Sequence, residues 1–329
     1  KNLLLLKGER WKDMRATISP TYTSSKMRGM FTLFQECTDQ FIEYLQMKGE
    51  KIDIELKDAF TRFTNDVIAS AAFGISCNSF KHPENEFYLM GKELTNFAGF
   101  WKTVNFLTMS LAPELATFLG LTFTSKRVNS FFRNLITSTI EAREKHGIVR
   151  PDMLHLLMEA KKGRLKHDND TNTVDSSFAV IEESDIGKDT KNRKIELTDD
   201  DLTAQAVTFF FAGFESVSNL MCFTCYELAV NCDIQQRLQN EIDGTLEKHD
   251  GVITYETLLE MKYLDMVLSE TLRKWPSIGL TDRVCAKPFT IQPVLQHEKP
   301  LHLEVNDVVV FVVLVVVLIV VVLIVVVAV

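Results

Sequence analysis

The sequence predicts a mainly α-helical protein, and three observations support this prediction. Apolar residues recur at helical spacing along residues 24–46, 60–73 and 125–146. A further apolar run, residues 199–230, is long enough for a helix that crosses a whole domain. The 329 residues are 46% hydrophobic and 24% charged, as in an ordinary globular chain that can bury a core.

Composition narrows the possible functions. The formal net charge of −8 argues against a nucleic-acid partner, because phosphate binding needs a concentrated basic surface. The 23 Phe residues indicate a large aromatic interior, so we expect a small or apolar substrate. The six cysteines lack the dense spacing of a disulfide scaffold. Cys222 and Cys225 form a CxxC within an apolar helical stretch, which favours core packing over redox chemistry or metal binding.

The helices before the long apolar run form a scaffold. The helix over residues 125–146 has a charged outer face and stops at Gly147, and a shorter helix over residues 153–162 is introduced by Pro151 and Asp152. The composition then becomes polar and charged between about residues 163 and 198, which predicts a long exposed loop.

Thr198, followed by three Asp residues, caps the predicted helix over residues 199–230. Its middle contains Gly213, which costs about 1 kcal/mol relative to Ala, and Glu215 beside Ser216 in a very apolar context. Two interpretations follow. Either Ala212 and Gly213 permit a close helix crossing with Glu215 in solvent, or they admit a flat cofactor while Glu215 and Ser216 relay protons.

Three more helices are expected over residues 233–248, 255–261 and 263–275. The last contains Glu270-Thr271-Leu272-Arg273, followed by Trp275 and Pro276. An ExxR pair is common on any helix and contributes only about 0.2 to 0.5 kcal/mol when exposed, so it carries no function by itself.

Taken in order, however, these segments resemble the cytochrome P450 haem-thiolate monooxygenases. Ala212-Gly213-x-Glu215-Ser216 resembles the family's oxygen-binding helix, Glu270-x-x-Arg273 its ExxR helix, and Trp11-x-x-x-Arg15 the helix that contacts a haem propionate. Residues 150–160, 263–270 and 281–285 are close to the microsomal branch, and to insect detoxification enzymes most of all. The resemblance covers about residues 7 to 305. It implies a truncated cytochrome P450 fold with little β-structure that lacks the haem-thiolate loop.

The resemblance also assigns residue roles. Trp11, Arg15 and Arg283 would neutralise the haem propionates, and Ala212 and Gly213 would lie over the porphyrin. Glu215 and Ser216 would deliver protons for O–O cleavage, although the family usually has Thr in place of Ser216. Glu270 and Arg273 would form a buried charge network that braces the core. The apolar substrate pocket would be lined by Phe211, Ser277, Ile278, Gly279, Leu280 and Thr281.

The same resemblance implies haem as cofactor, small apolar substrates of xenobiotic type, and NADPH-cytochrome P450 reductase as partner. Arg10 and Lys12 would lie near the surface where that reductase docks. The expected location is the cytoplasmic face of the endoplasmic reticulum membrane. The competing hypothesis is a non-catalytic, membrane-tethered helical binding protein derived from the same scaffold.

The segment after Asp307 departs from the family pattern. The family's ligand loop has the form FxxGxRxCxG, and no cysteine of this chain stands in that context, so we expect no axial metal ligand here. We therefore expect residues 1–307 to be a partial cytochrome P450 domain, inactive as it stands. Residues 308–329 are all apolar and would be either a non-native extension or a transmembrane segment.

Overall fold

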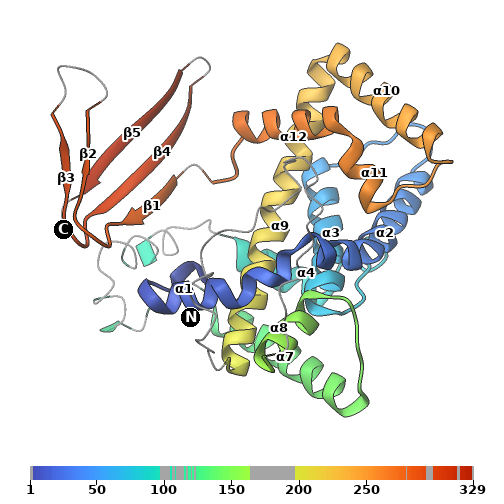
Figure 1. Cartoon of the computed structure of the whole chain (residues 1–329). Helices are drawn as coiled ribbons and strands as arrows, with labels where there is room; N and C mark the ends of the chain where they lie inside the picture. Colours follow the sequence, from blue (N-terminus) through green and yellow to red (C-terminus); the bar gives the residue numbers. More distant parts are fainter. Residues whose placement is uncertain are drawn as a thin grey trace. The chain divides into compact units, whose positions relative to one another are not determined.

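The computed structural model describes residues 3–96, 124–163, 197–278, 280–293, 299–316 and 319–327, with single positions 104, 105, 108, 115, 118, 119 and 121. The chain divides into two compact units, Lys1–Asp265 and Met266–Val329. The first unit is built from helices, and the strands lie in the second (Figure 1). The predicted mainly α fold with little β-structure is confirmed. The loop expected at residues 163–198 lies almost wholly outside the described residues.

The helices follow one another along the chain with short connections. They are η1 (Leu3–Leu5), α1 (Gly8–Ile18), η2 (Ser19–Tyr22), α2 (Ser24–Met47), α3 (Leu56–Ile68), the π-helical turn η3 (Ala69–Phe73), α4 (Glu86–Thr95), α7 (Lys126–His146), α8 (Met153–Lys161), α9 (Asp199–Val230), α10 (Cys232–Lys248), α11 (Tyr255–Glu260) and α12 (Lys262–Lys274).

Capping residues set several of these boundaries. Ser125 accepts from the backbone N–H of Val128 at the start of α7, and Gly147 ends that helix with φ +62°. Thr198 and Asp201 form a reciprocal capping box at the start of α9. The predicted caps and the predicted bounds of α9 are confirmed, because local chemistry alone determines these ends.

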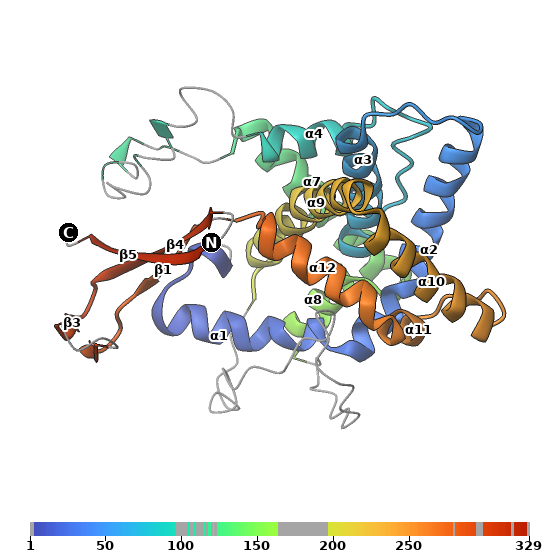
Figure 2. The same ribbon diagram turned by 90° about the horizontal axis from the view of Figure 1, so that it is seen from above.

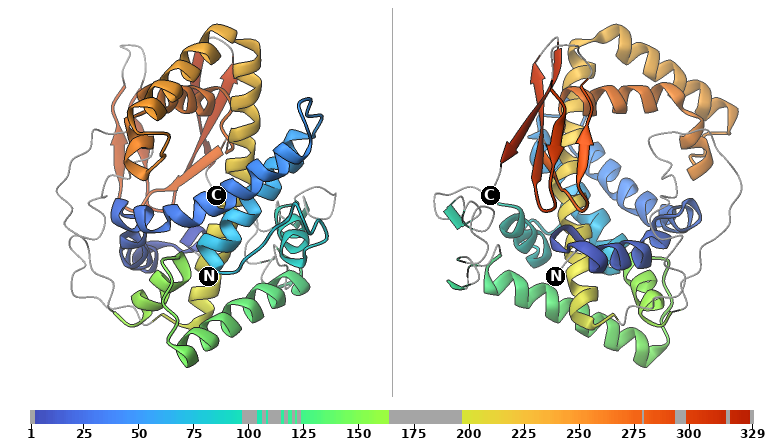
Figure 3. Two further views of the ribbon diagram at one scale, coloured as in Figure 1. Left: turned by 90° about the vertical axis from the view of Figure 1, so that its right-hand side faces the viewer. Right: turned by 60° about the vertical axis from the view of Figure 1, so that its left-hand side comes forward.

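The long helix α9 is central to the packing of the first unit. Figure 2 shows α9 nearly end-on among α3, α4 and α7, and Figure 3 follows it in yellow from the green helices α7 and α8 toward α10. Five buried rings from four helices and η3 meet beside it. They are Phe73, Phe87, Phe132, Phe210 and Phe214. Phe210 and Phe214 stack with ring centroids 4.9 Å apart, so one face of α9 is fixed by aromatic packing.

A buried ion pair joins α7 to the start of α8. Arg143 donates to both carboxylate oxygens of Asp152 at 2.8 and 2.6 Å, and the two side chains are 4% and 0% exposed. Gly74 lies against this pair with φ +69°, and a Cβ there would come within 1.8 Å of the Arg143 guanidinium. Glycine is therefore required at the end of η3 for both backbone and space.

The second unit contains most of α12 and five strands. Strands β1 (Leu280–Val284), β4 (Val308–Val316) and β5 (Ile319–Val327) form one antiparallel sheet in the order β1-β4-β5, and β2 (Phe289–Ile291) pairs with β3 (Leu301–Leu303). The apolar tail thus forms strands and not the helix that a membrane-spanning segment would need. β-branched residues explain this, because Val and Ile are stiff at χ1 and pack well on a pleated sheet.

Among the described residues, α9 is the one helix long and apolar enough to cross a membrane. Its apolar residues are also what a core helix requires, since Leu202, Ala206 and Phe210 are completely enclosed by the first unit. We therefore interpret α9 as a core helix.

Candidate functional site on helix α9

Helix α9 presents two different faces around its central small residues. Successive residues of an α-helix are rotated by about 100°, so Ala212 and Ser216 lie on one face, about 40° apart. Phe214 and Ser218 lie toward the opposite face and are buried. Ala212 is exposed, so the face that carries Ala212 and Ser216 is not covered by the described part of the first unit.

Gly213 lies against helix α3. A Cβ built on Gly213 would lie 2.3 Å from Cδ1 and 2.9 Å from Cγ1 of Ile68. Nearby, the buried Thr64 hydroxyl donates to the carbonyl oxygen of Phe214 at 2.9 Å. The close-crossing interpretation therefore accounts for Gly213, whereas Ala212 is on the open face. The position of Gly213 over a porphyrin remains a prediction for which this geometry gives no support.

Glu215 is paired with a lysine and does not extend freely into solvent. Its carboxylate Oε1 lies 2.8 Å from Nζ of Lys57, at the start of α3. The same Nζ donates to Oγ of Ser218 at 2.7 Å. The side chains of Lys57 and Glu215 are 36% and 40% exposed, so the pair lies at the rim of the α3 contact.

The Ser216 hydroxyl bonds along the helix. Its Oγ donates to the carbonyl oxygen of Ala212, one turn earlier. Such a back-bond satisfies the hydroxyl locally and weakens the backbone ladder slightly at that turn. Ser216 and Ala212 are therefore coupled on the open face.

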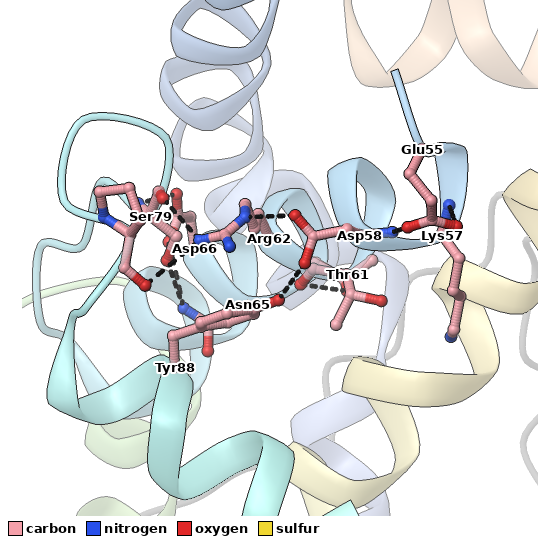
Figure 4. A network of polar contacts seen from close by, with 11 residues as sticks. Glu55, Lys57, Asp58, Thr61, Arg62, Asn65, Asp66, Ser79 and Tyr88 are labelled. Atoms are coloured by element: carbon pink, nitrogen blue, oxygen red, sulfur yellow. Dashed lines mark hydrogen bonds and ion pairs between the residues drawn. The ribbon is translucent and has the colours of Figure 1, made fainter.

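Helix α3 is itself held by an extensive polar network, shown in Figure 4. Arg62 donates to Asp58 at 2.7 Å, and the Tyr88 hydroxyl of α4 donates to the other oxygen of Asp58 at 2.9 Å. Partial burial by itself would raise the pKa of Asp58, but the hydrogen bonds from Arg62 and Tyr88 outweigh it and lower that pKa. Asp58 is therefore held as a carboxylate that ties α3 to α4.

A second part of the network is deeper. Asp66 accepts from the backbone N–H and the hydroxyl of Ser79 at 2.8 and 2.6 Å, and from Asn65 at 3.1 Å. Burial raises the pKa of Asp66, and these hydrogen bonds oppose the rise. Both parts of the network fix α3, and they thereby fix the residues that α3 presents to α9.

Trp11 and Arg15 lie one turn apart on α1, as the spacing predicts. Trp11 is partly buried and packs against the main apolar cluster. Arg15 lies close to Tyr22, where burial raises the tyrosine pKa and the Arg15 charge lowers it in part. Arg10 forms a long ion pair of 3.8 Å with Asp201 at the start of α9. Propionate binding by Trp11 and Arg15 stays a prediction.

The expected buried charge network at the ExxR segment is not what the structure contains. Arg273 donates to Glu270 at 2.6 and 2.7 Å, and the two side chains are 62% and 54% exposed. The hydrogen bond from Arg273 lowers the pKa of Glu270. Two charges with no buried partner keep their hydration, because desolvation would cost more than their attraction returns. The pair is thus an exposed i, i+3 bridge.

The remaining predicted site residues are not brought together in the described part of the chain. Phe211 is half-buried on α9, and Ser277 and Ile278 are exposed after α12. Gly279 lies outside the described residues, as do the side chains of Leu280 and Thr281. Arg283 on β1 is exposed and donates to the carbonyl oxygen of Asp282 at 2.7 Å. Their predicted roles remain predictions.

Sequence reasoning missed three residues that shape the site: Lys57, Thr64 and Ser218. Each acts across the α3–α9 crossing, over a separation of about 150 residues or more. Lys57 is unremarkable in sequence, one of several charges at a helix start. Only Ser218 carried a signal, as a polar residue one turn and a half after the small residues.

Comparison with known proteins agrees with these features. The family model "Cytochrome P450" matches residues 1–296. Cytochrome P450 9e2 of Blattella germanica is 47% identical over 307 residues, covering 88% of this chain and 55% of the relative. Cytochrome P450 9c1 of Drosophila melanogaster is 39% identical over 312 residues, covering 94% and 57%. The chain spans about half the length of the curated relatives it matches.

Proposed function

Because the chain belongs to the cytochrome P450 family, we propose that it forms the oxygen-side wall of a haem-thiolate monooxygenase that oxidises small apolar substrates of xenobiotic type. The observation that carries the proposal is the exposed face of Ala212 and Ser216 in the middle of an otherwise apolar core helix. A small apolar side chain beside a hydroxyl leaves room for a flat cofactor and a diatomic molecule.

The residues on this side fit a haem in part. Ala212 would lie against the porphyrin face, and Trp11 and Arg15 would present an indole N–H and a guanidinium to a propionate. Gly213 has another occupation, since its missing Cβ is filled by Ile68. When bound, a haem supplies oxygen binding and activation. We propose none of the six cysteines of this chain as its thiolate ligand, because none stands in the ligand-loop context.

Proton delivery is the proposed role of Glu215 and Ser216. The Ser216 hydroxyl is held one turn from Ala212, where it can pass a proton toward the open face. Glu215 is half-exposed and can exchange protons with solvent. The reaction consumes protons, so an acid at the rim and a hydroxyl on the face form a plausible relay in the chemical sense of donor and carrier.

We further propose that NADPH-cytochrome P450 reductase supplies the electrons and that the protein works at the cytoplasmic face of the endoplasmic reticulum membrane. The basic side chains Arg10 and Lys12 on α1 support a docking surface for an acidic partner. Lys12 is 55% exposed and pairs only with its own-helix neighbour Glu9 among the ion pairs of the described residues.

The test is a haem titration of the full chain, followed by the Soret absorbance. Ala212→Phe places a ring on the open face and should weaken haem binding at least tenfold. Ala229→Phe makes the same change at an exposed position of α9 four turns away from Ser216 or nearly so, and should leave haem binding within twofold. Equal binding by the two variants would refute the assigned face. Binding of apolar ligands without any haem would support the non-catalytic binding protein.

A further inference from the structure

The rim residue Glu215 has a position set by another helix. On a helical wheel Glu215 lies about 60° from Ala212 and about 60° from Ser218, between the open face and the buried face. A carboxylate at such a rim can turn either way. Its observed partner, Nζ of Lys57 at 2.8 Å, is on the α3 side.

The ammonium of Lys57 is held in place independently of Glu215. It donates to Oγ of Ser218 at 2.7 Å, and Ser218 is completely buried. The Ser218 hydroxyl in turn lies 3.0 Å from the carbonyl oxygens of Phe214 and Glu215, to one of which it donates. A buried anchor therefore fixes the cation, and the half-exposed carboxylate comes to it.

The backbone around Lys57 is also fixed. Glu55 caps α3 and accepts from the backbone N–H groups of Lys57, at 3.0 Å, and of Asp58 (Figure 4). The other titratable groups near Glu215 are Glu55 and Cys222. Burial raises the pKa of Cys222, so its thiol stays neutral beside the ion pair.

From this geometry we propose that Lys57 is a positioning residue for Glu215. It holds the carboxylate on the α3 side of α9, away from Ser216, so that Glu215 reaches the open face only when the ion pair opens. The relevance to proton delivery rests on the function proposed above, whereas the positioning itself does not. An ion pair of this exposure favours its closed form by no more than about fivefold, so opening is frequent.

The test is the rate at which a water-soluble carbodiimide and an amine label Glu215 in the haem-free full chain, read by peptide mass spectrometry. Lys57→Met removes the cation and should raise that rate about threefold to fivefold, the whole preference of such a pair. Lys57→Arg keeps the charge and should stay near the wild-type rate. Ser218→Ala removes the anchor and should raise the rate by less than Lys57→Met does.

Lys81→Met is the matched control. Lys81 pairs with Glu43 at 3.1 Å, with both side chains about half exposed. This variant should raise labelling of Glu43 and leave Glu215 unchanged. Circular dichroism melting of each variant shows whether the fold is kept, since a structural effect would change melting and all labelling together.

An unchanged Glu215 rate in Lys57→Met, or an equal rise in Lys57→Arg, would overturn the proposal. The haem titration fails or succeeds separately from this labelling. If haem does not bind while Lys57→Met still exposes Glu215, the proposed function fails and the positioning role stands. If haem binds as proposed and Glu215 labelling ignores Lys57, the positioning role alone is lost.

Discussion

Substitution of Gly213 by Ala separates the two explanations for a glycine in the middle of α9. A methyl group there would come within 2.3 Å of Cδ1 of Ile68, so that side chain must move or α3 must shift. Replacing Gly by Ala in a helix interior gains about 1 kcal/mol, and overpacking costs about 1 to 3 kcal/mol. We therefore expect the free energy of unfolding to change by between zero and a loss of about 2 kcal/mol.

Gly244 is the matched control, because it lies within α10 and a Cβ there meets no atom within 4 Å. Gly244→Ala should stabilise the chain by about 1 kcal/mol, so the two variants should differ by about 1 to 3 kcal/mol. The assay is denaturant unfolding of the haem-free chain, with Gly213→Ala repeated in an Ile68→Val background, where Cδ1 is gone. Equal stabilisation by the two Ala variants would refute the crossing and indicate that Gly213 serves a ligand instead.

Three other outcomes are expected. Arg143→Met should lower the free energy of unfolding by about 3 to 5 kcal/mol in denaturant titration, because it leaves the Asp152 carboxylate buried without its cation. Burial raises the pKa values of Cys37 and Cys77 from 9.0 to about 12. The folded chain therefore keeps thiol protons that the unfolded chain releases, and stability should fall above pH 9, by at most about 1.4 kcal/mol per thiol per pH unit, unless both are changed to Ala. Glu241 accepts from two backbone N–H groups of α12 at 2.8 Å each, so Glu241→Gln should cost about 1 kcal/mol and speed hydrogen exchange in the first turn of α12.

Elements with strong local signals could be predicted from the sequence. The start of α9 depends on Thr198 and Asp201, three residues apart, and the end of α7 on Gly147. Helix α4 was missed, although Asn85 caps it and its buried residues recur at helical spacing. Its ten residues follow a loop of polar and turn residues, where a short amphipathic pattern is easily overlooked.

The site was less predictable because its contacts join distant segments. The motif around Gly213 suggested small residues for a cofactor, but whether a glycine faces a ligand or a neighbouring helix depends on the crossing with α3. The ExxR pair was expected to be buried and is exposed, because burial depends on partners that a single helix cannot supply. The apolar tail had the length of a membrane helix, yet its β-branched residues form strands.

The most direct test of the central claim is the reduced carbon monoxide difference spectrum of the haem-loaded chain. Carbon monoxide occupies the oxygen side of the iron, so the account predicts a carbonyl band that Ala212→Phe removes and Ala229→Phe keeps. It also predicts that this band lacks the shift given by a thiolate ligand, since none of the six cysteines is assigned to the iron. A thiolate-type band, or a band that ignores Ala212→Phe, would contradict the account.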